Sequence, residues 1–465
     1  MQIADLALQR SKYKPLSDDE WRWFLQQEEG RQRTADKLPT FAAIPEWWYP
    51  VRLSCEQCSS ELTARYKAQL IQAKPVFQQS GLSAEQPFSP QDGLSAMVDL
   101  TGGYGVDTFF LSQHFAHTDY VEQNAELCRI AAHNFAISQQ PTVNAKQPHI
   151  SIHNTTAEAF LQAEELSNSL SGLTAQRSNS LSGLTGEANH IAKRYSLIFL
   201  DPARRDSHGG KVFRLQDCTP DVTALLPTLL SHLAPDGRIL LKLSPMLDIT
   251  QALKELSSIP NHLSPITNYQ SPITNYQWDI HIVAVKNEVK EVLLLSGGTG
   301  QITAIDLSQN VPPFVFTREE EQSAQAEIFN SQEPESHYLY EPSAAILKAG
   351  AYKLVAARFG LQKRDPNTHL YISDTLIPSF PGRVWQIDQP ITRSGLPANG
   401  KSGFRKEGLF TNPQSPITQA NILVRNYPLT PDQLKKKLHL RDGGTAFVIG
   451  CSIAGRPTLF LAHRV

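Results

Sequence analysis

The chain has no long hydrophobic run. No segment approaches the roughly 18 consecutive apolar residues of a membrane-spanning helix, and Met1 to Leu6 lack the basic stretch followed by an apolar stretch that marks a secretory leader. We therefore expect a cytoplasmic protein without a membrane partner. Apolar residues make up 40% and charged residues 19% of the chain, a composition that excludes wholesale disorder.

Cysteine is scarce, with five residues among 465. The number is odd and the positions are scattered, which does not indicate a disulfide framework and fits a reducing compartment. Cys55 and Cys58 have the spacing of half a zinc site or of a redox pair, but no second Cys/His pair follows at the spacing of a zinc finger. We expect no bound metal.

The net charge is only −2, but it is unevenly distributed. Residues 345–465 contain 17 Lys and Arg against 6 Asp and Glu, a balance of +11 that leaves −13 for residues 1–344. This uneven charge is explained by a basic module that binds a polyanion and is joined to a domain with a different function. A solvated basic face accounts for it equally well.

The length predicts two or three domains. The first segment, residues 1–80, has a helical pattern. Ser17 precedes an acidic first turn and predicts the start of one helix. A second helix is predicted to start near Ser54, which has the spacing of a capping box, and to run through Ala68. A link at 78–93, with two prolines, separates this segment from the next.

Strands and helices alternate between residues 92 and 297. Such alternation implies parallel strands joined by right-handed crossovers, hence a doubly wound α/β sheet of the Rossmann-like kind. The last two strands, 279–285 and 290–295, are joined by a short polar turn that permits only antiparallel pairing. The other predicted strands are 96–100, 118–121, 149–153, 195–200 and 237–243, and the predicted helices are 106–115, 124–136, 156–166 and 220–233.

Two duplicated segments interrupt this pattern. The sequence of residues 167–174 recurs at 178–185, and that of residues 264–270 recurs at 271–277. Two copies are too few for a repeat fold, and their Ser, Asn, Gly and Pro content predicts exposed loop insertions near 167–190 and 264–277.

The remainder of the chain is predicted to form smaller α+β units. Residues 298–390 are interpreted as a loop-rich linker followed by an α+β region, which includes a helix that ends at Gly350. Residues 391–465 are interpreted as a basic α+β domain with a helix at 431–438 and strands at 445–450 and 458–462.

A glycine-rich turn joins the first strand of the α/β segment to its first helix. Asp99 closes the strand, and Gly103 and Gly105 let the backbone approach a ligand closely. A lone turn of this kind suits a dinucleotide or an adenosyl cofactor. Its spacing differs from the Gly-x-Gly-x-x-Gly of a pyrophosphate site, and Asp107 beside it is expected to repel a pyrophosphate.

Acidic residues follow three of the predicted strands: Asp99, Glu122 and Asp201. Because the carboxyl ends of parallel strands meet at one edge of a sheet, we expect these side chains to converge. Glu122 lies 23 residues after Asp99, at a position where an acidic side chain can accept hydrogen bonds from both hydroxyls of a ribose. Together the three residues favour an adenosyl-cofactor site.

At these residues the chain resembles the class I S-adenosylmethionine (SAM) dependent methyltransferases. Asp99 to Gly105 is similar to their first motif, Glu122 to their ribose-binding acid, and Asp201 to Arg204 to their fourth motif. Over most of its length the chain is similar to a bacterial group of methyltransferases with a THUMP-like C-terminal domain. The segments that carry this similarity are Glu56–Glu61, Leu241–Ile249, Asn287–Glu291 and Asn426–Leu429.

The resemblance implies SAM as the cofactor. Two positions depart from the family pattern: Thr101 stands where many members have their first glycine, and Thr156 stands where an acid often holds the adenine amino group. The residues assigned to cofactor binding are Asp99, Thr101, Gly102, Gly103, Gly105, Glu122, Thr156 and Pro202.

Methyl transfer from a sulfonium needs an acceptor lone pair aligned behind the methyl carbon, so positioning dominates the chemistry. Asp201 is the predicted catalytic residue, which orients an exocyclic amine. Methyltransferases of such amines typically have Asn/Asp-Pro-Pro-aromatic here, and Ala203 and Arg204 stand where they have the second proline and the aromatic residue, so the target base stays open. The predicted substrate contacts are Ala203, Arg204, Arg205, Lys435 and Lys436, the basic ones for phosphate.

The leading hypothesis is a SAM-dependent methyltransferase that modifies a base nitrogen in a structured RNA, with the basic C-terminal module binding the RNA. A methyltransferase that acts on DNA, protein or a small molecule is an alternative. A nucleic-acid-binding protein that has lost turnover is another.

Overall fold

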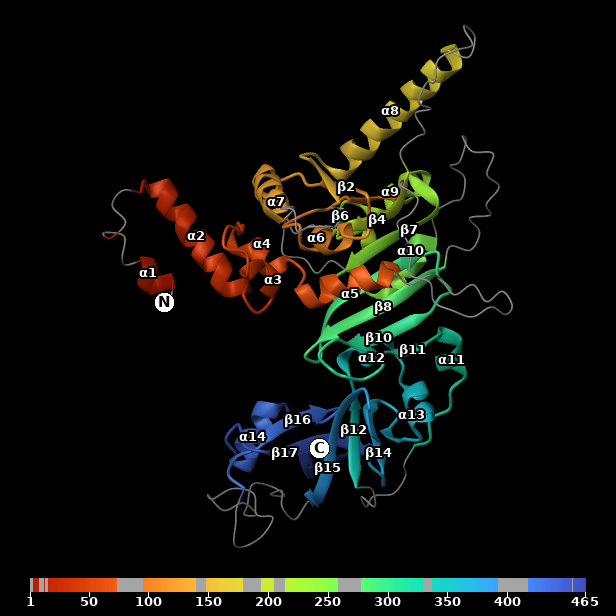
Figure 1. Cartoon of the computed structure of the whole chain (residues 1–465). Coiled ribbons are helices and arrows are strands. Elements are labelled where there is room, and N and C mark those ends of the chain that lie inside the picture. The colour runs from red at the N-terminus through yellow and green to blue at the C-terminus, as the bar shows by residue number, and fades with distance from the viewer. Residues whose placement is uncertain are drawn as a thin grey trace. The chain divides into compact units, whose positions relative to one another are not determined.

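The computed structural model describes residues 3–7, 12, 16–72, 95–138, 148–178, 194–204, 214–257, 277–328, 337–391, 417–453 and 455–465. The chain divides into two compact units. The first consists of Met1–Asp279 and Leu293–Thr299, and the second of Ile280–Val292 and Gly300–Val465. Figure 1 labels many of the helices and strands of each unit.

The N-terminal segment is helical, as predicted. Ser17 is the predicted N-cap: it accepts a hydrogen bond from the backbone N–H of Glu20 and forms a capping box with that residue. The second predicted helix is wrong in its bounds, because Cys58 is extended and divides it into two helices; Ser54 lies inside the first of them. The helices are α1 (Ile3–Ala7), α2 (Asp18–Thr34), α3 (Pro39–Ala42), α4 (Arg52–Gln57) and α5 (Glu61–Gln72).

A large twisted sheet with a parallel central part confirms the predicted α/β fold class. Its nine strands follow the order β11-β10-β8-β9-β7-β4-β1-β2-β3, and the pairs among β3, β2, β1, β4 and β7 are parallel. The bounds of these strands are β1 (Ala96–Asp99), β2 (His117–Val121), β3 (His149–His153), β4 (Tyr195–Leu200) and β7 (Leu233–Leu243).

The first four connecting helices follow the predicted order, and the fifth was not predicted. They are α6 (Val106–Ser112), α7 (Ala125–Ser138), α8 (Ala157–Ser178), α9 (Val222–Ser231) and α10 (Ile249–Ser257). Helix α8 is longer than predicted, so the first copy of the 167–174 duplication is helical instead of a loop. Most of the second copy and nearly all of the 264–277 duplication lie outside the described residues.

The sheet continues beyond the predicted hairpin. Strands β8 (Trp278–Val285) and β9 (Glu288–Ser296) are joined by Lys286 and Asn287, which have φ of 54° and 59°, as a tight hairpin turn requires. The segment after it was expected to be loop-rich. Instead β10 (Ile302–Asp306) pairs parallel to β8, and β11 (Phe314–Phe316) pairs antiparallel to β10.

A second sheet of seven strands forms most of the second unit, in the order β13-β14-β12-β15-β18-β17-β16. The predicted helix 431–438 is present as α14 (Pro431–Leu438). The helix predicted at 340–350 is shorter, because residues 340–342 belong to a strand; it is α12 (Ala344–Ala349), and Gly350 ends it with φ of 82°. Helices α11 (Arg318–Ser323) and α13 (Lys353–Phe359) complete the unit. The strands are β12 (Tyr338–Pro342), β13 (Gln362–Asp365), β14 (Thr368–Ser373), β15 (Gly382–Ile391), β16 (Asn421–Arg425), β17 (Ala446–Ile453) and β18 (Arg456–Arg464).

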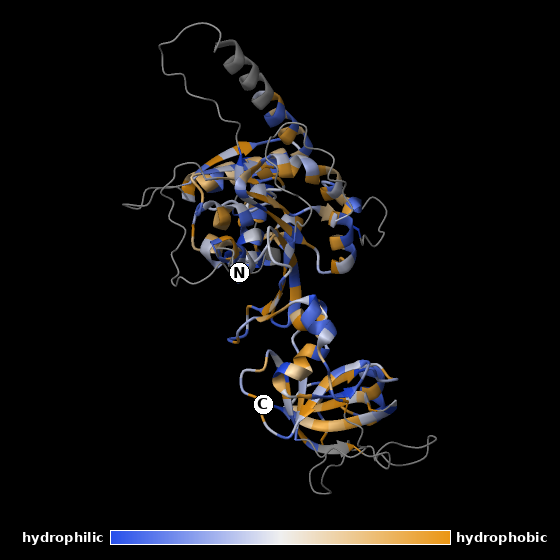
Figure 2. Cartoon of the chain, turned by 90° about the vertical axis from the view of Figure 1, so that its right-hand side faces the viewer, coloured by the Kyte–Doolittle hydropathy of each residue, from blue (hydrophilic) through white to orange (hydrophobic). Residues whose placement is uncertain are grey.

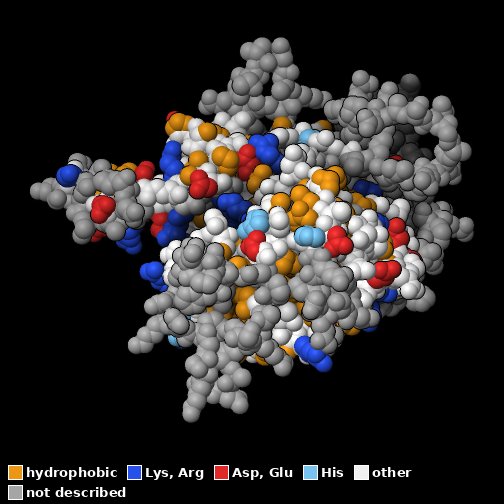
Figure 3. Space-filling model, turned by 90° about the horizontal axis from the view of Figure 1, so that it is seen from below, with side chains coloured by type: hydrophobic (Ala, Val, Ile, Leu, Met, Phe, Trp, Pro, Cys, Tyr) orange, Lys and Arg blue, Asp and Glu red, His pale blue; other side chains and the backbone are white. Residues whose placement is uncertain are grey.

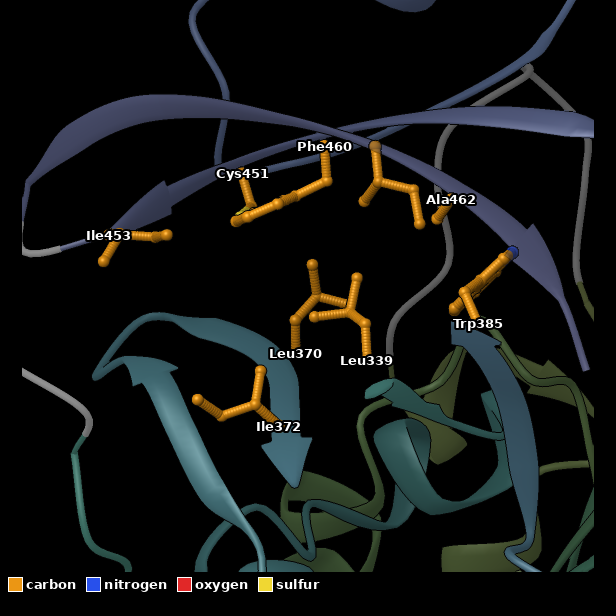
Figure 4. Close-up of a cluster of buried hydrophobic side chains, with 9 residues drawn as sticks. Leu339, Leu370, Ile372, Trp385, Cys451, Ile453, Phe460 and Ala462 are labelled. Carbon is orange, nitrogen blue, oxygen red and sulfur yellow. The ribbon is translucent and has the colours of Figure 1, made fainter. Parts of the chain in front are cut away.

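The core of the second unit lies between strands that are distant in the sheet order. Figure 4 shows Leu339, Leu370 and Ile372 opposite Phe460 and Cys451. Hydrophobic residues are also frequent along the strands of this sheet in Figure 2. A sheet that brings β12 and β14 against β17 and β18 must curl strongly, and its two ends then come together.

A buried carboxylate helps to join those ends. Glu341 of β12 is bound by Arg383 of β15, and its Oε1 accepts a hydrogen bond of 2.6 Å from Nε of Arg425, at the end of β16. Asn426 donates to Thr368 of β14 from the same side, at 3.3 Å. The ion pairs therefore connect the first and last parts of the second sheet.

Candidate active site

The glycine-rich turn lies at the carboxyl end of β1. Gly102 packs beneath Tyr120, because a Cβ at this position would lie 2.2 Å from the tyrosine ring. Gly103 and Gly105 have φ of +56° and +83°, which L side chains rarely adopt. Tyr120 donates a hydrogen bond of 2.6 Å to the carbonyl oxygen of Gly103 and fixes the turn from below.

The space above Gly103 is open. A Cβ built at this glycine meets only the backbone oxygen of Thr101, at 3.7 Å. The backbone N–H of Gly103 donates a hydrogen bond of 2.9 Å to Glu122 Oε2, and that of Asn124 donates one of 2.7 Å to Oε1. The half-buried Glu122 carboxylate is thus oriented at the edge of the turn 102–105, which we call the glycine cradle. A carboxylate in this position suits the ribose hydroxyls of an adenosyl cofactor.

Asp99 is buried and organises the turn. One of its oxygens accepts a hydrogen bond of 3.0 Å from the backbone N–H of Thr101, and the other lies 2.5 Å from the Thr108 hydroxyl. Burial raises the pKa of Asp99 to about 7. Its predicted contact with the cofactor stays a prediction; the structure shows its contacts within the turn.

We expect Asp99 to make stability depend on pH. Its pKa in the folded chain is above its ordinary 3.8, so its contribution is complete below about pH 4 and is lost as the pH rises through about 7. Asp99→Asn removes this titration. Between about pH 5 and pH 8, urea denaturation should show the free energy of unfolding of the wild type falling relative to that of the variant. A difference that does not change with pH would contradict the expectation.

Thr101 connects the glycine turn to the third acidic residue. Its hydroxyl accepts a hydrogen bond of 2.7 Å from the backbone N–H of Asp201, which follows β4. Strands β1 and β4 are neighbours in the sheet, so the two turns lie side by side. The threonine that departs from the family glycine therefore fixes the position of Asp201.

Asp201 forms an ion pair that the sequence analysis missed. Lys242, near the end of β7, lies 2.5 Å from Asp201 Oδ2. The same ammonium lies 3.6 Å from Asp107, which pairs with Lys67 of α5 at 3.1 Å and accepts a hydrogen bond of 2.7 Å from Ser59. Lys242 and Ser59 both belong to segments that carry the family resemblance, so their presence was a usable signal.

We expected Asp107 to repel a pyrophosphate because its negative charge would be open to the turn, and that premise is wrong. The side chain is buried among cations instead of open to the turn. Burial alone would raise the pKa of Asp107, but the ammonium groups of Lys67 and Lys242 outweigh it and lower that pKa. The charge is thus neutralised inside the protein.

The other residues predicted around Asp201 are partly described. Pro202 is buried, and Ala203 is exposed in the short strand β5 (Ala203–Arg204), which pairs with β6 (Cys218–Thr219). The Arg204 side chain and all of Arg205 lie outside the described residues. Thr156 is exposed, and its hydroxyl accepts a hydrogen bond of 3.2 Å from the backbone N–H of Ala159 in the first turn of α8.

The two predicted phosphate-binding lysines of α14 differ. Lys435 lies 2.6 Å from Asp442 and 3.5 Å from Asp432, so its charge is compensated locally. Lys436 is exposed and forms no ion pair within the part of the chain that the structure describes. The face in Figure 3 shows Lys and Arg side chains interspersed with Asp and Glu instead of gathered into one patch.

Cys55 is buried and Cys58 is half-buried. Burial raises the pKa of Cys55 to about 12 and also raises that of Cys58, which disfavours the thiolates that react or bind metals. Among the described residues, no group of three or more His, Cys, Asp or Glu side chains is arranged to hold a metal ion. Within those same ranges, no helix is long and apolar enough to cross a membrane.

Comparison with known proteins finds similarity over most of the chain. Residues 338–381 match a ferredoxin-like domain family and residues 411–464 match a THUMP domain-like family. A candidate methyltransferase of Porphyromonas gingivalis with a solved structure is 28% identical, with a TM-score of 0.69, over 97% of this chain and 92% of its own. No curated protein matches the chain.

Two further solved structures show much weaker likeness. A SAM-dependent methyltransferase of Agrobacterium tumefaciens is 15% identical over 40% of this chain and 46% of its own, with a TM-score of 0.25. An O-methyltransferase of Bacillus cereus in complex with SAH is 11% identical over 58% of this chain and 90% of its own, with a TM-score of 0.30.

The nearly full-length match confirms the predicted fold class, and the C-terminal family match confirms the predicted THUMP-like domain. The chain is similar throughout to a candidate methyltransferase, and it has a THUMP-like domain at its C-terminus. The glycine cradle, Glu122 and Asp201 lie at one edge of a sheet whose fold is shared with that candidate methyltransferase.

Proposed function

We propose that the protein transfers the methyl group of SAM to a base nitrogen in a structured RNA. The observation that supports the proposal is the hydrogen bond from the backbone N–H of Asp201 to the Thr101 hydroxyl, which joins the turn of Asp201 to the glycine-rich turn. In the proposed division of labour, residues 92–297 perform transfer and residues 391–465 bind RNA. Residues 1–80 and 298–390 are then the helical N-terminal segment and the connecting α+β region.

The residues of the cradle fit an adenosyl cofactor. Glu122 would bind the ribose hydroxyls, and the backbone at Gly103 and Gly105 would face the rest of the cofactor. Asp99 and Thr101 act within the protein, since their contacts hold the turn and Asp201. SAM supplies an electrophilic methyl group when it is bound.

Gly103 offers a specific test of the cradle. We expect Gly103→Ala to weaken SAM binding at least ~10-fold, because its Cβ would enter the open space above the turn. The left-handed backbone conformation costs an alanine about 1 kcal/mol of folding free energy, and this cost is common to the variant and its control. Gly360→Ala is the matched control, since Gly360 has φ of +61° and nothing within 4 Å of an added Cβ, at the end of α13. Calorimetry with SAM should show loss for the first variant only; equal affinities would contradict the assignment.

Asp201 is suited to orient a neutral N–H donor. Its Oδ2 is held by Lys242, so the pair has no net charge. A carboxylate held in this way is better placed to accept a hydrogen bond from an amine than to remove a proton, which agrees with a transfer controlled by positioning.

The charge of the C-terminal module and the THUMP-like match support RNA as the substrate. A truncation at residue 345 is not a clean test, because it removes β14 and β15 and leaves β12 without its partners. Single surface charges are better probes, and α14 offers both an exposed and a compensated lysine.

We expect Lys436→Gln combined with Lys437→Gln, both exposed on α14, to weaken binding of total transfer RNA several-fold. If both lysines contact phosphate, the slope of log affinity against log salt concentration should fall by about 1.4 to 1.8. Lys435→Gln is the control, because Asp432 and Asp442 already compensate that charge. Filter binding at several salt concentrations measures both quantities. An equal effect of the control would show that α14 does not bind RNA in this way.

A further inference from the structure

Four charged side chains form a continuous line from the N-terminal helices to the site. Lys67 Nζ lies 3.1 Å from Asp107, Lys242 Nζ lies 3.6 Å from Asp107, and Lys242 Nζ lies 2.5 Å from Asp201. The exposed fractions of the first three side chains are 0% for Lys67, 9% for Asp107 and 10% for Lys242, whereas Asp201 is 39% exposed. The line therefore runs from the interior to the surface of the site.

We propose that Lys242 is a positioning residue for Asp201. We also propose that Lys67 and Ser59, from the N-terminal helical segment, contribute to the active site by binding Asp107 and so leaving Lys242 to Asp201. This inference rests on the proposed function, since it concerns the carboxylate assigned to orient the acceptor.

Lys242 has two carboxylates within reach, and the distances show which one it favours. It lies closer to Asp201 than to Asp107, although Asp107 is the more buried of the two. Attraction between charges is stronger in the interior than at the surface, so Asp107 alone would compete effectively for Lys242. Lys67 and Ser59 satisfy Asp107 instead. The N-terminal cation thus leaves Lys242 to hold Asp201.

The balance of charges supports this coupling. Among these four side chains, two ammonium groups face two carboxylates. Removing Lys67 leaves one cation between two anions, and Lys242 should then move toward Asp107. Removing the Asp107 charge as well should return Lys242 to Asp201. A purely structural role for Lys67 does not predict such a restoration.

The test follows the titration of Asp201 by NMR of full-length protein with ¹³C-labelled aspartate, assigned with Asp201→Asn. Lys242→Met should raise the titration midpoint of Asp201 by about 1 to 3 pH units, as loss of an adjacent opposite charge does. Lys67→Met should raise it less, and Lys67→Met with Asp107→Asn should restore it. Lys242→Arg should keep it near the wild-type value. Lys254→Met, which removes an exposed charge on α10, is the control.

Activity provides the second readout, with tritiated SAM and total RNA. Lys242→Met should move the acid limb of the pH profile of kcat upward by the same interval, with SAM affinity retained. An unchanged Asp201 titration in Lys242→Met would overturn the inference, as would failure of Asp107→Asn to restore the Lys67→Met variant. The titration needs no substrate, so absence of RNA methylation by the wild type counts against the proposed function and leaves the positioning test intact.

Discussion

Asp201→Ala abolishes methyl transfer, with a fall in kcat of at least ~100-fold, while SAM affinity stays near that of the wild type. Misplacement of an acceptor by about 1 Å is enough for a loss of this size. The backbone N–H of Asp201 still donates to Thr101 in the variant, so the turn keeps its position. Initial rates with tritiated SAM measure transfer, and calorimetry measures cofactor binding.

Asp236→Ala is the control for this variant, because Asp236 is an exposed aspartate within β7. Its turnover should equal that of the wild type. Turnover by Asp201→Ala at the wild-type rate would remove Asp201 from the proposed catalytic role.

Glu341→Ala destabilises the second unit by about 2 to 3 kcal/mol. Removal of one partner from a buried ion pair costs about 3 to 5 kcal/mol. The effect here is smaller because the side chains of Arg383 and Arg425 are 28% and 40% exposed and water can solvate them. Since the carboxylate joins β12 to β15 and to the end of β16, the loss should affect this sheet first.

Trp385 reports on this transition, because it is the only tryptophan of the second unit and is buried in its core. Its ¹⁹F signal in protein labelled with 5-fluorotryptophan should disappear at a lower urea concentration in Glu341→Ala. Glu288→Ala removes a surface pair with Lys290 and should change the free energy of unfolding by less than about 0.5 kcal/mol. Equal effects of the two substitutions would contradict the account of Glu341.

Local sequence was enough to predict the parallel part of the large sheet. The strands at 149–153 and 195–200 have the predicted bounds. Strand 195–200 is a compact apolar run, and the hairpin at Lys286 and Asn287 follows from the short link between its strands. Strands β10 and β11 were missed because they are short and pair with segments that local pattern does not identify.

The chemistry of the site was only partly predictable, because its charges are set by distant contacts. Lys67 and Lys242 are separated by 174 positions, and local pattern gives no sign that both meet Asp107. Asp107 therefore appeared as an open charge. Lys435 is a similar case, since Asp442 compensates it from beyond the end of α14. The acidic residues at strand ends were easier to predict, because the fold alone brings them together.

Incubation with tritiated SAM tests the central claim most directly. Purified protein is mixed with total RNA, DNA and protein from cells that lack the gene, and with Asp201→Ala protein in parallel. The account predicts label in RNA, sensitive to ribonuclease, carried by a base and absent with the variant. Label found only in DNA, protein or small molecules, or none in any fraction, would contradict it.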